Sequence, residues 1–266
     1  MNLSNIKLHN SFRSKNVIKV ITGIHNTNIY QIAQIAKAAD LARASYLDVS
    51  ANTEIVKFLK SFSSLPLCIS SIDPIDIYNC ISAGADLVEI GNYDVFYNQG
   101  MYITSFQLVE LVKEVKYLVG DIDLCVTIPY YLDLNEQIHL AQFLESLGVN
   151  VLQTEGLLTH GVHHLSSQLS ALTDSLSSSL LSTHFISQSV SIPVITSSGM
   201  SSTFASTAIY CGASGIGIGS ALRVKHNITS MARYINEIKN CMLTDDVNLY
   251  QSREYLSITN MSEPML

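Results

Sequence analysis

The sequence predicts a single (β/α)8 barrel, and three observations lead to this fold class. A strand followed by a helix recurs eight times along the chain, with no stretch in which strands follow each other directly. The last two strands carry glycine and serine at their C-terminal ends, within Ser191–Leu222. The first turn, 22–26, holds one glycine, whereas an open doubly wound sheet would need Gly-x-Gly-x-x-Gly there.

Short apolar runs mark the eight strands. Each run is bounded by polar or glycine-containing turns, and each is too short for a buried helix. We therefore expect strands at Val17–Gly23, Tyr46–Ala51, Leu67–Ile72, Asp86–Gly91, Asp123–Tyr130, Val149–Glu155, Pro193–Ser198 and Gly215–Ser220.

Residues that can cap a helix stand after four of these strands. Three of the caps have Gln31, Gln107 or Glu136 three residues later, which is the spacing of a capping box. Asp73 precedes Pro74, and proline suits the first position of a helix. The predicted helices therefore begin beside Asn28, Asp73, Thr104 and Asp133. After the sixth strand, leucines at helical spacing between Leu165 and Leu180 predict another helix.

One domain accounts for the chain. Its 266 residues are an ordinary length for such a barrel, and we assign residues 1–242 to it, including a short N-terminal lead. Residues 243–266 show weak periodicity and are expected to form a C-terminal tail.

The composition excludes several classes of partner. With a net charge of -7 and only 14% charged residues, the chain has too few positive charges to bind the phosphates of nucleic acid. No apolar run is long enough to cross a bilayer, and Met1–Asn16 lacks the apolar core of a secretory signal. The five cysteines form no Cys-x-x-Cys pair, which argues against a zinc knuckle or a thioredoxin motif and fits a reducing compartment. We expect no metal site.

The glycine-rich ends of strands seven and eight predict a phosphate cradle. Glycine lets the backbone approach an anion, and the helices that follow direct N–H groups toward it. The alternative is that these glycines only let the strands pack closely. The cradle is assigned to Ser198, Gly199, Gly217, Gly219 and Ser220, with backbone contributions from Met200 and Ala221.

Three charged residues interrupt otherwise apolar strands. Lys19 stands in the first strand, Asp48 in the second and Glu89 in the fourth. A buried lysine can act as a base or a Schiff-base nucleophile, and Asp48 is its natural partner. We take these three as the candidate catalytic residues. A purely structural set of buried ion pairs would explain them equally well.

Other polar residues near the strand ends are weaker candidates. Gln153 and Glu155 share one face of the sixth strand, and either can point to the barrel mouth. Thr127 is more typical of a strand-end hydrogen bond, and a lone His25 of an exposed loop. A histidine cluster follows the sixth strand, but Gly161 interrupts its helical spacing, so a solvated loop is favoured over a metal site: His160, His163 and His164.

Four segments resemble one family, the hypothetical-chloroplast-reading-frame family of plastid genomes and cyanobacteria. They are Ile18–Ile24, Tyr46–Ala51, Leu87–Asn92 and Gly212–Ser220, and the likeness extends over roughly Val17 to Ile238. The resemblance implies the chloroplast stroma, or the cytoplasm of a cyanobacterium. It implies no activity, because the family has no established reaction.

Three functions remain open on this basis. The first is an enzyme acting on a phosphorylated small metabolite, a lyase, synthase or isomerase that uses Lys19 with Asp48. The second is an FMN-binding, oxidoreductase-like barrel, with the FMN phosphate in the cradle and the ring over the mouth. The third is a non-catalytic barrel that senses a metabolite or binds a partner protein. The fold itself does not choose between them.

Overall fold

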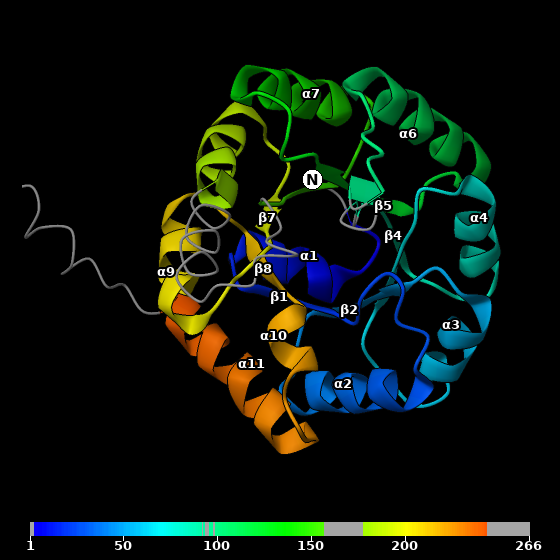
Figure 1. Cartoon of the computed structure of the whole chain (residues 1–266), viewed down its shortest axis with the longest axis vertical. Coiled ribbons are helices and arrows are strands. Elements are labelled where there is room, and N and C mark those ends of the chain that lie inside the picture. The colour runs from blue at the N-terminus through cyan, green and yellow to red at the C-terminus, as the bar shows by residue number, and fades with distance from the viewer. Residues whose placement is uncertain (1–2, 92, 94–95, 98, 157–177, 244–266) are drawn as a thin grey trace, which may run out of the picture.

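The computed structural model describes residues 3–91, 93, 96–97, 99–156 and 178–243. Its eight parallel strands close into a barrel in chain order, with the first strand paired to the last. Figure 1 views this barrel along its axis, ringed by helices. The predicted (β/α)8 fold is therefore confirmed. The strands are β1 (Val17–Ile21), β2 (Tyr46–Ser50), β3 (Leu67–Ser70), β4 (Leu87–Ile90), β5 (Asp123–Ile128), β6 (Val151–Thr154), β7 (Val194–Thr196) and β8 (Gly215–Ile218).

Every strand is shorter than the apolar run that predicts it. The ladders are one to three residues shorter than the runs, although single backbone hydrogen bonds continue past some strand ends, as from Thr22 to Asp48 and from Ser197 to Thr154. At the functional end, Ser198 lies two residues beyond β7, and Gly219 and Ser220 follow β8. These residues therefore belong to loops and to a helix start rather than to strands.

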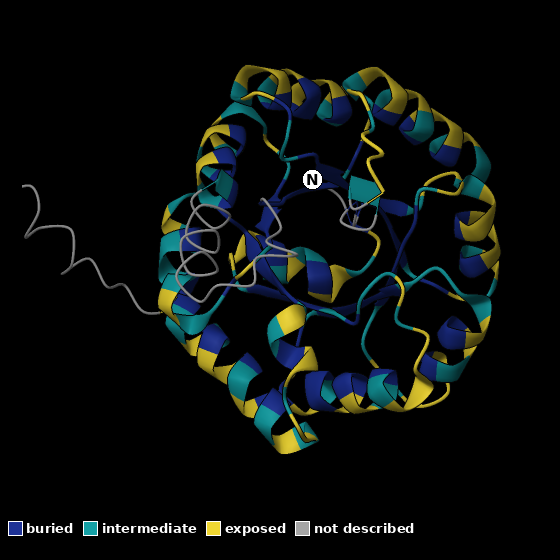
Figure 2. Ribbon diagram, viewed as in Figure 1, coloured by how far each residue is buried: buried dark blue, intermediate teal, exposed yellow. Residues whose placement is uncertain are grey.

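Helices cover the outside of the barrel. They are α2 (Ile29–Leu41), α3 (Thr53–Lys60), α4 (Pro74–Ser82), α6 (Ser105–Val119), α7 (Leu134–Ser146), residues 178–189, α9 (Ser202–Tyr210), α10 (Ser220–Arg223) and α11 (Ile228–Leu243). The four predicted caps are confirmed, since each side chain accepts a hydrogen bond from the first turn of its helix. Figure 2 shows buried inner faces and exposed outer faces on this ring.

The N-terminal lead forms a helix that the sequence analysis does not predict. Helix α1 (Ile6–Arg13) begins after Asn5, whose side chain accepts from the N–H of Leu8. Leu8 and Phe12 pack against the apolar residues at the N-terminal end of the barrel interior. Helix α1 thus closes that end, and in Figure 1 it lies across the barrel.

Part of the predicted organisation lies outside the described residues. This holds for the tail from residue 244 onward, for the leucines of the predicted stripe up to residue 177, and for His160, His163 and His164. Among the helices that the structure does describe, none has both the length and the apolarity needed to cross a membrane.

The strand pleat divides the apolar core in two. Ile18, Val20 and their counterparts on the other strands face outward and pack against the helices. Val17, Tyr46, Cys68 and their counterparts face inward and form the lower layer of the interior, above α1. Because side chains alternate along a strand, the inward positions two residues further on form the next layer.

Candidate functional site

The middle layer of the barrel interior is polar. Six strands each contribute one inward-facing polar side chain, two positions after a residue of the lower apolar layer. All six side chains are almost completely shielded from solvent. The layer consists of Lys19 on β1, Asp48 on β2, Ser70 on β3, Glu89 on β4, Thr127 on β5 and Gln153 on β6.

Lys19 lies at the centre of this layer. Its Nζ is 2.9 Å from Asp48 Oδ2 and 2.9 Å from Gln153 Oε1, and it also pairs with Glu89 Oε2. Burial alone would lower the pKa of Lys19, but the carboxylates of Asp48 and Glu89 outweigh it and hold that pKa well above its usual value. Lys19 is therefore an ammonium ion at neutral pH. This state suits a fixed positive charge and does not suit a Schiff-base nucleophile.

Both carboxylates are held by hydrogen bonds from neighbouring strands. Ser70 Oγ donates to Asp48 Oδ1 at 2.5 Å. Thr127 Oγ1 and Gln153 Nε2 donate to Glu89 Oε1 at 3.0 and 2.9 Å. Two carboxylates nevertheless face one ammonium, and burial raises the pKa of Glu89 even though Lys19 opposes the shift. The layer is thus rigidly oriented and carries more acid than base.

A polar layer at this depth is unusual for the fold. Bulky branched residues normally fill the interior of such barrels, and a well-packed apolar layer is often as stable as a buried ion pair or more so. In the described part of the chain no buried side-chain nitrogen or oxygen lacks a partner, so the layer is also fully satisfied. Stability alone does not require Lys19, Asp48 and Glu89 at these positions, which makes them candidates for function.

The loop after β7 has a backbone conformation that non-glycine residues rarely adopt. Ser198 has φ +70° and Gly199 has φ +69°. Ser198 Oγ accepts a hydrogen bond from the N–H of Gly156 at 3.1 Å, which ties this loop to the end of β6. Strained backbone of this kind concentrates at ligand sites.

At the end of β8, neighbouring side chains leave too little space for any side chain larger than that of glycine. A Cβ at Gly217 would lie 3.1 Å from Ser197 Cβ and 3.2 Å from Ile21 Cδ1, so this glycine faces the crowded interior. Gly219 is half-buried at the mouth, and Ser220 begins α10. Ser198, Gly199, Gly219 and Ser220 thus share the C-terminal end of the barrel. Gly217 does not, because it lies within β8, paired with Lys19 at the depth of the polar layer.

Arg223 is a site residue that the sequence analysis misses. A Cβ at Gly219 would lie 3.1 Å from one terminal guanidinium nitrogen of Arg223, and a Cβ at Gly23 would lie 3.3 Å from the same atom. The guanidinium therefore lies between the ends of β1 and β8, beside the predicted cradle. A signal exists in the sequence, since a basic residue stands four positions after the last glycine, one helical turn away.

The other polar residues that the sequence suggests as site residues lie in different parts of the structure. Thr127 and Gln153 belong to the polar layer. Glu155 lies above it, and its Oε1 accepts from Tyr97 Oη at 2.5 Å and from the N–H of Tyr130. His25 is exposed, and the described residues contain no cluster of metal-binding side chains.

The fold and this site define a (β/α)8 barrel with a buried acid–base layer beneath a glycine-lined mouth. A family model described as "Protein of unknown function (DUF561)" matches residues 3–248, and the chain belongs to this family. Relatives carry the description "Uncharacterized protein ycf23". The one from Antithamnion sp. is 46% identical over 98% of both chains. The one from Porphyra purpurea is 37% identical over 92% of both. The resemblance to hypothetical chloroplast reading frames is therefore confirmed.

Solved structures share the fold at low sequence identity. A (S)-3-O-geranylgeranylglyceryl phosphate synthase from Thermoplasma acidophilum, in complex with sn-glycerol-1-phosphate, aligns with TM-score 0.61 at 14% identity, over 91% of this chain and 99% of its own. Orotidine 5'-phosphate decarboxylase from Pyrococcus horikoshii aligns with TM-score 0.58 at 13% identity, over 83% of this chain and 99% of its own. Identities this low establish the architecture alone.

Replacing the central cation tests how the layer is held together. We expect Lys19→Met to lower the free energy of unfolding by about 3–5 kcal/mol, because it leaves two buried carboxylates unpaired. The triple variant with Asp48→Asn and Glu89→Gln should lose less, because it has no buried charge left to compensate. Urea denaturation measures both. A single variant within about 1 kcal/mol of the native protein would show that the ion pairs contribute little.

The raised pKa of Glu89 has a consequence for stability against pH. Between its ordinary pKa of about 4.5 and its higher folded value, the folded protein binds a proton that the unfolded chain has lost. The free energy of unfolding should therefore fall as pH rises through this window. In Glu89→Gln we expect this fall to become smaller, as measured by urea denaturation at a series of pH values; the part that remains comes from Asp123, whose pKa burial also raises. The exposed Glu54→Gln is the control and should keep the full fall; an unchanged profile in Glu89→Gln would contradict the assignment.

Proposed function

We propose that this barrel is an enzyme acting on a phosphorylated small molecule at its C-terminal mouth, as a lyase, synthase or isomerase. The observation that carries the proposal is the buried layer of Lys19, Asp48 and Glu89 beneath a mouth suited to an anion. In this fold the C-terminal end of the strands is where active sites lie. The proposed location is the plastid stroma, which the family membership supports.

The phosphate end of the ligand is assigned to the loops after β7 and β8. Among the described residues, no backbone carbonyl is recorded as accepting a hydrogen bond from the N–H of Gly199, Met200 or Ser220. The Arg223 guanidinium beside Gly219 supplies a fixed positive charge. Together these donors suit a phosphate dianion. Structural neighbours whose names include a phosphorylated substrate support a phosphorylated ligand for this fold.

The reacting part of the substrate would face Lys19 and Asp48. The Lys19 ammonium can stabilise negative charge that develops on a substrate oxygen if that oxygen replaces one of its three present acceptors, Asp48, Glu89 or Gln153. Asp48 is the group placed to take up or return a proton, with Ser70 fixing its orientation. Carbanion-type reactions, such as C–C cleavage or isomerisation next to a carbonyl, need this pair of roles. Because Lys19 and Asp48 are almost completely buried, substrate contact would need side chains near them, such as Ile21 beside Gly217, to move aside.

Phosphate binding is tested first by removing the guanidinium. Arg223→Gln should weaken binding of inorganic phosphate and of sn-glycerol-1-phosphate by about 10- to 100-fold, because a charge-assisted hydrogen bond contributes about 1.5–3 kcal/mol. Lys225→Gln is the matched control. It removes the same charge two residues away, where the Lys225 ammonium lies 4.7 Å from the Tyr234 ring. Isothermal titration calorimetry measures both. Equal losses in the two variants, or no saturable binding by the native protein, would overturn the assignment.

Turnover is tested in a plastid extract depleted of the protein. We expect added native protein to change the amount of at least one phosphorylated metabolite, and Asp48→Asn to leave it unchanged, as followed by mass spectrometry. The exposed Glu54→Gln should act like the native protein. Phosphate binding without any change in metabolites would favour the sensing barrel instead. Flavin absorbance in the native protein would favour the FMN barrel, and borohydride trapping of a substrate on Lys19 would contradict the role given to its ammonium.

A further inference from the structure

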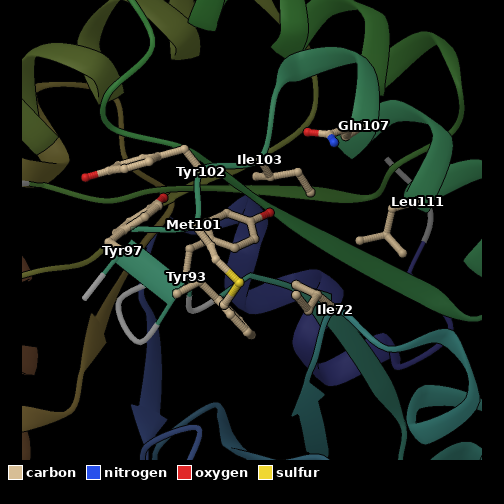
Figure 3. Close-up of a pocket in the computed structure, with 9 residues that line it drawn as sticks. Ile72, Tyr93, Tyr97, Met101, Tyr102, Ile103, Gln107 and Leu111 are labelled. Atoms are coloured by element: carbon tan, nitrogen blue, oxygen red, sulfur yellow. The ribbon is translucent and has the colours of Figure 1, made fainter. Parts of the chain in front are cut away.

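An apolar cavity of about 330 Å³ opens beside the barrel mouth. It is enclosed by the end of β3, the loop between β4 and α6, and the first turns of α6 (Figure 3). Eight of its nine lining residues are aromatic or aliphatic, and Gln107 is the ninth. Neither the polar layer nor the proposed phosphate loops use this space.

Three polar atoms of the lining residues are engaged by the protein: the hydroxyls of Tyr93 and Tyr97 and the amide oxygen of Gln107. Tyr93 Oη donates to the carbonyl of Ile90 at 3.2 Å, and Tyr97 Oη donates to Glu155 at 2.5 Å. The side chain of Gln107 accepts from the N–H of Thr104 at the start of α6. Burial raises the pKa of both tyrosines, so their hydroxyls stay uncharged at neutral pH. The cavity therefore presents a carbon surface, which favours a hydrocarbon group over a polar or charged one.

The cavity lies on the side of the mouth opposite the phosphate loops. Ile72 follows β3 and stands two residues after Ser70 of the polar layer. Tyr93 Oη also contacts the carbonyl of Thr127 on β5. The cavity thus belongs to the ends of β3, β4 and β5, whereas the phosphate loops follow β7 and β8 (Figure 1). A molecule that reaches from one to the other passes over Lys19 and Asp48.

The entrance of the cavity leaves apolar surface uncovered. Met101 is 47% exposed and Tyr102 is 55% exposed, although both line the cavity. The Tyr102 ring stacks on Tyr97 with ring centres 5.6 Å apart, which fixes its orientation without covering it. An apolar ligand that entered here would remove this surface from water, and contiguous exposed apolar surface of this kind marks binding sites.

We infer that the substrate is amphipathic: a phosphate ester whose other end is a hydrocarbon chain that fills this cavity. The inference rests on the proposed function, because the phosphate loops fix one end of the molecule. It adds a substrate class to that function. The polar layer then acts on the segment between the two ends, and the hydrocarbon chain supplies binding energy remote from the reacting atoms.

A series of n-alkyl phosphates from methyl to octyl tests the inference, with affinities measured by isothermal titration calorimetry on the full chain. We expect affinity to rise about fourfold per added methylene until the cavity is filled, because each buried methylene contributes about 0.8 kcal/mol. Leu111→Asn places an amide in the cavity wall and should flatten this rise. Tyr117→Asn is the matched control, because Tyr117 is on the same helix, 89% exposed, and does not line the cavity.

The outcomes separate the two proposals. Arg223→Gln should weaken every member of the series by a similar factor and leave the dependence on chain length intact. If methyl phosphate binds but affinity does not rise with chain length, the hydrocarbon subsite is wrong and the phosphate site stands. If the corresponding n-alcohols bind as tightly as the phosphates, the phosphate site is wrong, and the amphipathic substrate is overturned with it.

Discussion

The burial of the Lys19 ammonium between two carboxylates is the constraint on which the rest of the barrel depends. A charge at this depth is tolerated only if its partners come from several directions, and Asp48, Glu89 and Gln153 reach it from three different strands. Their strands must therefore keep one register around the closed sheet. The lower layer and helix α1 complete the arrangement, because they exclude water from beneath the ion pairs.

The same constraint explains two glycines that lie beside the polar layer. Gly91 directly follows β4, and a Cβ there would lie 2.3 Å from Thr127 Oγ1 and 2.8 Å from Glu89 Oε1. The polar layer thus leaves no room for a side chain above it at this strand. Gly217 is confined in a similar way by Ser197 and Ile21. These two glycines admit backbone near the charged groups, so their presence serves both the packing of the layer and the approach of a ligand.

How far the sequence predicts this molecule depends on whether a feature is local or made by the closed fold. Charged residues in apolar strands identify Lys19, Asp48 and Glu89, since an unpaired buried charge is too unfavourable to stand alone. The partnership of Gln153 and Thr127 with Glu89 requires the register between strands, which period-two alternation does not give. Helix α1 is not predicted because a polar segment acquires its role only from what it packs against. Arg223 has a sequence signal in its position one helical turn after Gly219, but only the closed barrel brings it beside the end of β1.

The two sides of the mouth differ in chemistry, although the barrel is built from eight similar strand–helix units. On the side of β7 and β8 the loops are short, rich in glycine and serine, and flanked by a guanidinium. On the side of β3 to β5 the loop between β4 and α6 brings in tyrosines whose hydroxyls bind the protein itself. A small, uniformly polar metabolite would use only the first side and leave Met101 and Tyr102 exposed to water. A ligand with unlike ends uses both sides and lies across Lys19 and Asp48, so the asymmetry of the mouth and the position of the charged layer have one common explanation.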